Sequence, residues 1–150
     1  CAVDGVVIRK DSSYLSKARL IKVVIYFSET DCNSCVIKNL HLWQEVMANF
    51  NGDELDFVFI FSKTYNLQDI LVESKLNLER PIYIDEYNMF RKLNSCILNS
   101  NMHNVFLLDS NNKIILLGNP IYNSDLNALY INTINNMLAH DGIYVPDEKN

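Results

Sequence analysis

The sequence predicts an α/β fold with a mixed central sheet, flanking helices, and a C-terminal β-hairpin followed by a helix. Two runs rich in β-branched and aromatic residues, 21–27 and 55–61, are too continuously apolar for half-exposed strands and are typical of strands buried on both faces. Apolar residues at helical spacing follow each run. Two further apolar runs, 105–109 and 113–117, enclose an Asn-rich turn. Strands that alternate with helices favour a parallel sheet, to which the hairpin adds antiparallel strands at one edge.

The length and composition indicate one globular domain. The chain has 150 residues, 49% of them hydrophobic and 21% charged, so it can bury a full core without metal or disulfide support. No apolar run approaches the roughly 20 residues that a membrane-spanning helix needs. The net charge is −5 and Lys and Arg never occur three in a row, which argues against nucleic acid as a partner. We expect a tether or edge segment at 1–20, with a short strand at Val6–Ile8, the main domain at 21–140 and a flexible tail at 141–150.

The first core strand, Ile21–Phe27, leads into a helix. The segment Ser28–Asp31 is rich in residues that cap helix N-termini, and Asp31 is the expected cap. Apolar residues then recur in steps of four, three, four and three, which places them on one helix face. They are Val36, Leu40, Trp43, Met47 and Phe50. Asn51 and Gly52 provide the stop signal.

The same alternation continues to the C-terminus. After the second core strand, we expect a helix at 67–74, a strand at 81–85, a helix at 86–93, the hairpin strands at 105–109 and 113–117, and a last helix. Ser124 is the expected cap of that last helix, and Leu126, Tyr130 and Ile134 lie on its apolar face.

Two of the four cysteines are placed for chemistry. Cys32 and Cys35 form a C-x-x-C pair between the first core strand and its helix, at the carboxyl end of that strand, where α/β sheets place their active sites. At this spacing two cysteines form a disulfide with little backbone movement. The helix N-terminus favours the thiolate of the first cysteine, which can attack a substrate disulfide before the second cysteine releases the product. We therefore expect Cys32 as nucleophile and Cys35 as resolving residue, with Cys96 a free thiol.

Structural zinc also uses C-x-x-C pairs. Such a site normally needs a second pair of Cys or His ligands, and the sequence contains no second pair. The position of Cys32 and Cys35 between a strand and a helix favours a redox pair.

The stretch Val23–Cys35 resembles the active-site stretch of the thioredoxin-like superfamily. Pro81–Asp85, Val105–Ile114 and Gly118–Pro120 resemble its TlpA and alkyl-hydroperoxide-reductase/thiol-specific-antioxidant branch, which carries an inserted helix and strand before the closing hairpin. The resemblance implies a thioredoxin fold and an extracytoplasmic, periplasmic thiol–disulfide oxidoreductase. It implies protein thiols and disulfides as partners, and no cofactor.

Three positions depart from the pattern of that family, and each is expected to modulate the site. Asp31 stands where the family usually has Trp or Pro, and its carboxylate opposes thiolate formation at Cys32, which favours a reducing couple. Tyr26 occupies the position of a buried acid that assists proton transfer. His103 occupies the position of a cis-proline beside which the substrate backbone pairs.

The replacement of that proline leaves a second hypothesis open. Cys32, Cys35 and His103 together would suit copper(I) or zinc, so the alternative is a non-enzymatic thioredoxin-fold module that binds a metal or a protein partner.

Cys1 resembles the lipid-bearing first residue of a mature bacterial lipoprotein. A lipid on Cys1 would attach the protein to a membrane and agrees with the extracytoplasmic location that the family resemblance implies. The alternative is that the sequence simply begins at this residue.

Overall fold

The computed structural model of the chain describes residues 21–28, 32–50, 54–63, 66–75, 82–98 and 104–147. The expected strand at Val6–Ile8 and the stop signal at Asn51 and Gly52 lie outside these residues. Of the helices that the structure describes, none is both long enough and apolar enough to cross a membrane.

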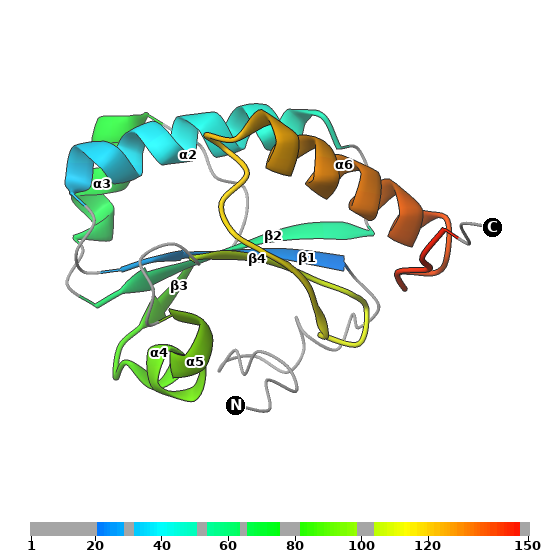
Figure 1. Cartoon of the computed structure of the whole chain (residues 1–150). Helices are drawn as coiled ribbons and strands as arrows, with labels where there is room; N and C mark the ends of the chain where they lie inside the picture. The colour runs from blue at the N-terminus through cyan, green and yellow to red at the C-terminus, as the bar shows by residue number, and fades with distance from the viewer. Residues whose placement is uncertain are drawn as a thin grey trace.

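A five-stranded mixed sheet forms the middle of the molecule (Figure 1). Its strands, in spatial order, are β3 (Ile82–Asp85), β2 (Leu55–Ser62), β1 (Ile21–Phe27), β4 (Val105–Leu108) and β5 (Ile114–Leu117). β1, β2 and β3 run parallel, whereas β4 is antiparallel to both β1 and β5. β5 therefore points the same way as β1, and we call the side of the sheet where β1, β2, β3 and β5 finish the carboxyl end. This topology confirms the predicted mixed sheet with its closing hairpin.

Helices cover both faces of the sheet (Figure 1). α2 (Asn33–Ala48), α3 (Leu67–Ser74) and α6 (Ser124–Leu138) lie over one face, and α4 (Met89–Leu93) and α5 (Ser95–Leu98) lie over the other. The order of elements is the predicted one, with α5 added. A single helical turn such as α5 is too short to show a hydrophobic period, so the sequence pattern did not indicate it.

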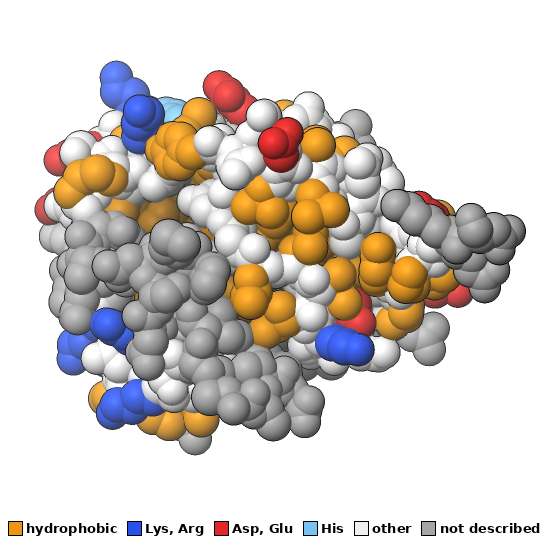
Figure 2. All heavy atoms as spheres, in the orientation of Figure 1, with side chains coloured by type: hydrophobic (Ala, Val, Ile, Leu, Met, Phe, Trp, Pro, Cys, Tyr) orange, Lys and Arg blue, Asp and Glu red, His pale blue; other side chains and the backbone are white. Residues whose placement is uncertain are grey.

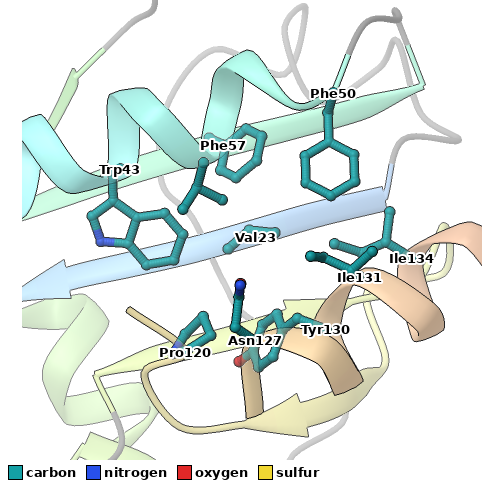
Figure 3. Close-up of a pocket in the computed structure, with 10 residues that line it drawn as sticks. Val23, Trp43, Phe50, Phe57, Pro120, Asn127, Tyr130, Ile131 and Ile134 are labelled. Carbon is teal, nitrogen blue, oxygen red and sulfur yellow. The ribbon is translucent and has the colours of Figure 1, made fainter. Parts of the chain in front are cut away.

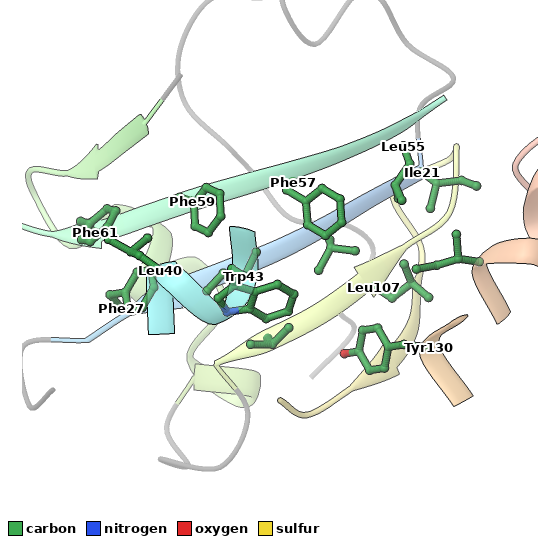
Figure 4. Packing of buried hydrophobic residues seen from close by; sticks show 14 of the residues in the cluster. Ile21, Phe27, Leu40, Trp43, Leu55, Phe57, Phe59, Phe61, Leu107 and Tyr130 are labelled. Carbon is green, nitrogen blue, oxygen red and sulfur yellow. The ribbon is translucent and has the colours of Figure 1, made fainter. Parts of the chain in front are cut away.

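Side-chain alternation along the central strands divides the core into two layers. In the layer under α2 and α6, Trp43 and Tyr130 pack in one cluster with Phe57 (Figure 4). Phe27 and Phe61 stack in the same layer, with ring centroids 4.6 Å apart. Burial of each such side chain stabilises the fold by roughly 1.5–3 kcal/mol. The predicted apolar face of the first helix is confirmed at Val36, Leu40 and Trp43, which are buried in this layer. The helix ends at Ala48, earlier than predicted, so Phe50 lies beyond it.

The second layer is smaller and lies under α4. Phe90 of α4 stacks on Tyr26 of β1, with centroids 5.6 Å apart, and on Phe106 of β4, with centroids 6.3 Å apart. These three rings attach the short helix to the two central strands. Both faces of β1 are therefore buried, as its continuous apolar sequence predicts.

The helix predicted at 86–93 begins later than expected, at Met89. Asp85, the last residue of β3, is only 6% exposed, and its carboxylate accepts hydrogen bonds from Phe90 N at 3.0 Å and Arg91 N at 3.1 Å. Asn88 precedes the helix in the left-handed region, with φ 54°, and its side chain makes no capping bond. The chain must therefore turn before α4 starts. The carboxylate of Asp85, five residues before Phe90, accepts the N–H groups that a local N-cap side chain would otherwise accept.

The start of the C-terminal helix also differs from the prediction. Asn123, not Ser124, caps α6, because its Oδ1 accepts a hydrogen bond from Leu126 N at 3.0 Å. Beyond the helix, Asn136 bonds both to the N and to the O of Val145, at 2.9 and 2.7 Å. Gly142 O accepts from Ser110 N in the turn between β4 and β5. Within the predicted tail, Gly142 and Val145 are thus hydrogen-bonded to the hairpin and to α6.

A buried charged group lies at the amino end of β1. Lys22 is 6% exposed, and its Nζ donates to Asn112 Oδ1 at 2.8 Å. Burial lowers the pKa of Lys22, and the nearby carboxylates of Asp56 and Asp109 partly offset that effect. The bond to Asn112 joins β1 to the turn between β4 and β5, at the end of the sheet opposite the cysteines.

The role of Asp85 can be tested by unfolding. We expect Asp85→Ala to lower the free energy of unfolding by about 1.5–3 kcal/mol, because buried N–H groups lose a charged acceptor. Asp85→Asn should cost less, since an amide oxygen can still accept. Urea unfolding followed by the fluorescence of Trp43, the single tryptophan of the chain, measures the change. Asp125→Ala, at an exposed position in the first turn of α6, is the control and should change stability by at most about 0.5 kcal/mol. Equal effects of the two alanine variants would contradict the assignment.

Candidate functional site

Cys32 and Cys35 lie where the central strand passes into α2. In the structure their sulfur atoms form a disulfide, with the two Cα atoms 5.1 Å apart. Both residues are solvent-exposed. Because β1 is the middle strand and ends at Phe27, the disulfide is placed at the carboxyl end of the sheet. The structure therefore brings together the two residues predicted as catalytic and leaves both open to a partner molecule.

The N-cap of α2 is Cys32 and not Asp31, which corrects the prediction. Cys32 has an extended backbone, with φ −74° and ψ 149°, and its Sγ accepts a hydrogen bond from Cys35 N at 3.2 Å. Cys32 O accepts from Val36 N at 2.9 Å and closes the first helical turn. The sulfur of Cys32, the residue predicted as nucleophile, thus itself takes the place that the sequence pattern assigned to a carboxylate, next to the free N–H groups of the helix.

Two features of this turn favour negative charge on Cys32 Sγ. Ser34 Oγ lies 3.4 Å away, so its hydroxyl can donate to a thiolate, as Cys35 N does. The first turn of α2 contains no acidic residue. The positive end of the helix macrodipole acts in the same direction. A thiolate at Cys32 would accordingly meet two hydrogen-bond donors from its own turn.

The residues expected to modulate the site are only partly described. Asp31, His103 and Cys1 lie outside the described residues, and so does the side chain of Cys96. Tyr26 is buried in the layer under α4, on the face of the sheet opposite α2. Its Oη lies 3.5 Å from Asp85 Oδ2. That Tyr26, in place of the family's buried acid, modulates the site stays a prediction.

A loop that reaches α2, the helix that begins at the cysteines, was not predicted from the sequence. After β5 the chain turns at Gly118, and Tyr122 Oη donates to Asn39 Oδ1 of α2 at 2.9 Å. Asn39 is four residues after Cys35 and so lies one turn further along the same side of the helix. The signal available in the sequence was the direction of β5, because a strand parallel to β1 must end at the same side of the sheet.

Two hydrogen bonds hold this loop at the sheet. Gly118 N donates to Val105 O at 2.8 Å, and Tyr130 Oη donates to Gly118 O at 2.7 Å. Burial raises the pKa of Tyr130 well above its usual range, so the hydroxyl stays protonated and remains a donor at neutral and moderately alkaline pH. Gly118 has φ 112°, which suits glycine, and a Cβ there would lie 3.2 Å from Leu126 Cδ2.

A small pocket lies between the second half of α2, α6 and β1 (Figure 3), and neither cysteine lines it. Its lining is apolar and includes Val23, Phe57 and Pro120, and its volume of about 10 Å³ holds about one water molecule. Trp43 also lines it, and among the described residues the Nε1 of Trp43 finds no hydrogen-bond partner. The pocket is too small for an organic substrate. A substrate of the cysteines would therefore bind on the exposed surface around the disulfide.

The predicted alternative metal site is not formed by described residues alone. Among those residues, no group of three His, Cys, Asp or Glu side chains is placed to hold a metal ion. The third ligand of the alternative site, His103, lies outside them.

Solved structures share this fold. The chain is similar to a Chlorobium tepidum structure assigned as thiol:disulfide interchange protein DsbE, with a TM-score of 0.59, 16% identity, and 86% of this chain and 85% of that chain covered. It is similar to a thioredoxin-like protein from Parabacteroides distasonis, with a TM-score of 0.57, 16% identity, and 83% and 90% covered. It is also similar to yeast mitochondrial 1-Cys peroxiredoxin, with a TM-score of 0.56, 15% identity, and 91% and 73% covered.

Sequence comparison alone finds no such likeness: no protein-family model matches the chain, and no curated protein sequence matches it. The structural likeness shows that the chain has a thioredoxin-like fold, as the resemblance of its active-site stretch implied.

The contribution of Ser34 can be measured on the reduced protein. We expect Ser34→Ala to slow the reaction of Cys32 with iodoacetamide near neutral pH by roughly fivefold, because one donor to the thiolate is lost. The dithiol should also become less stable relative to the disulfide in a glutathione buffer. Asn33→Ala, in the same exposed turn, is the matched control and should leave both values unchanged. Faster labelling of Cys35 than of Cys32 in the wild-type protein would reverse the assigned roles.

Proposed function

We propose that the protein is a thiol–disulfide oxidoreductase that exchanges disulfides through Cys32 and Cys35. The observation that carries the proposal is the exposed Cys32–Cys35 disulfide in the first turn of α2, with Cys32 Sγ at the N-cap. The thioredoxin-like fold and the thiol:disulfide interchange protein among the similar structures support it.

The chemistry transfers two electrons from the dithiol to the substrate. The Cys32 thiolate attacks one sulfur of a substrate disulfide, the substrate S–S bond breaks, and the departing sulfur leaves as a thiolate that takes up a proton. A mixed disulfide between Cys32 and the substrate remains. Cys35, as thiolate, then attacks Cys32 Sγ and releases the second substrate sulfur. The product is the Cys32–Cys35 disulfide, which is the state in this structure. A second dithiol protein must reduce it before the next cycle.

We further propose that the physiological direction is reduction of the substrate. Asp31 precedes Cys32 directly in the sequence, and its negative charge opposes the thiolate that the helix N-terminus favours. A less stabilised thiolate makes the dithiol a better reductant. The substrates in this proposal are protein disulfides.

The location that we propose is extracytoplasmic, where proteins carry disulfides that need reduction or exchange. The resemblance to the TlpA branch supports this location. Attachment to a membrane through a lipid on Cys1 stays a prediction, which labelling of cells with radioactive palmitate would test.

The proposed function is tested by titrating the cysteine pair against reduced and oxidised glutathione. We expect wild-type protein to interconvert between dithiol and disulfide, and Cys32→Ser to abolish reduction of a protein disulfide such as that of insulin. Cys35→Ser should accumulate the mixed disulfide, because the resolving thiol is gone. Cys96→Ser, outside the pair, is the control and should retain exchange.

The proposal is wrong if the wild-type thiols cannot be joined by a mild oxidant or if Cys32→Ser keeps its activity. The same titration in the presence of Zn²⁺ or Cu⁺ tests the alternative site of Cys32, Cys35 and His103. Protection of both thiols from oxidation by the metal would favour that alternative.

A further inference from the structure

An exposed aromatic ring stands beside the active-site helix. Tyr122 is 65% exposed, and it lies in the loop 118–123 between β5 and α6. Tyrosine rings of this exposure are common on protein surfaces, so exposure alone has no meaning. The position of the ring and the way in which its hydroxyl is held distinguish Tyr122.

The loop 118–123 and the cysteines are at the same end of the sheet. β5 points the same way as β1, so both strands deliver the chain to the carboxyl end. Gly118 bonds to Val105, which pairs with Ile25 two residues before β1 finishes. The loop therefore starts at the level where β1 approaches the C-x-x-C turn, and it continues toward α2 (Figure 1).

The loop has few conformations open to it. Besides the bonds of Gly118, Asn119 Oδ1 accepts a hydrogen bond from Ile121 N at 3.0 Å, and Pro120 is buried. Tyr122 then has its backbone fixed by the loop and its hydroxyl fixed by Asn39. A ring held at both ends loses little further freedom when a partner binds against it.

The residue that holds the Tyr122 hydroxyl, Asn39, is a neighbour of Cys35 on α2. Side chains four residues apart on a helix have Cβ atoms about 5–6 Å apart, so Asn39 and Cys35 are neighbours on the surface of α2. The hydroxyl of Tyr122 bonds to the first of these residues, and its ring is 65% exposed about one helical turn from the second. The middle of this face carries hydrophobic and uncharged side chains (Figure 2), which suits contact with a polypeptide.

We infer that the ring of Tyr122 is a contact surface for polypeptide substrates and makes the exchange selective for protein disulfides over small ones. The inference rests on the proposed function, since it concerns the substrate of the same cysteine pair. A polypeptide that places its disulfide at Cys32 has chain on either side of that disulfide, and this chain can cover the ring. A small disulfide such as oxidised glutathione reaches the sulfur with much less flanking structure.

The test compares two substrates across four proteins. We expect Tyr122→Ala to lower kcat/KM for the reduction of insulin by about tenfold, the effect typical of removing a contact aromatic. The rate with oxidised glutathione and the equilibrium with glutathione should stay within twofold of wild type. Tyr122→Phe keeps the ring but loses the bond to Asn39, so its insulin activity should lie between those of wild type and Tyr122→Ala. Tyr144→Ala is the matched control, because Tyr144 is also exposed but follows Gly142, which bonds to the hairpin turn at the opposite end of the sheet. The fluorescence of Trp43 in urea verifies that each variant is folded.

The outcomes separate the inference from the proposed function. If wild-type protein exchanges with glutathione and Tyr122→Ala reduces insulin at the wild-type rate, the inference is overturned and the proposed function stands. An equal loss with both substrates also overturns it, because Tyr122 would then act only by holding α2. If wild-type protein fails to exchange with glutathione, the proposed function is wrong and the inference falls with it.

Discussion

All seven residues of β1 are buried, and the strand is hydrogen-bonded to β2 on one side and β4 on the other. A strand enclosed in this way cannot shift without exposing apolar side chains or breaking two ladders of hydrogen bonds. Its end at Phe27 is therefore a fixed point in the molecule. The C-x-x-C turn follows within a few residues, so the exposed sulfur atoms come directly after a strand that is buried over its whole length.

The features that could be predicted from sequence are those that depend on composition along one segment. The continuous apolar runs of β1 and β2 and the helical spacing from Val36 to Phe50 predicted elements that the structure confirms. Helix boundaries set by tertiary contacts could not be found this way. Asp85 caps α4 from the end of a strand, across a turn, and no local pattern marks a carboxylate at that distance as a cap.

In the candidate site, too, local features could be predicted from the sequence and long-range contacts could not. The spacing and position of Cys32 and Cys35 identified the pair, because the chemistry of C-x-x-C is local. The bond between Tyr122 and Asn39 joins residues 83 positions apart, so it became visible only in the folded chain. The N-cap at Cys32 was missed for a different reason: sulfur is not among the usual capping atoms, and the neighbouring Asp31 has a stronger statistical preference.

The central position of β1 also sets the order in which the strands of the sheet can pair. Val24 pairs with Phe106, which is 82 positions later (106 minus 24), whereas its other neighbour, Val58, follows after 34 (58 minus 24). During synthesis from the N-terminus, one edge of this buried strand thus stays open until β4 has emerged. Such an edge can pair with other chains, and closing it requires a long loop, which slows folding. A nascent chain of this protein consequently carries an unpaired strand edge until residue 106 has been made, which is when contact with other chains is least hindered.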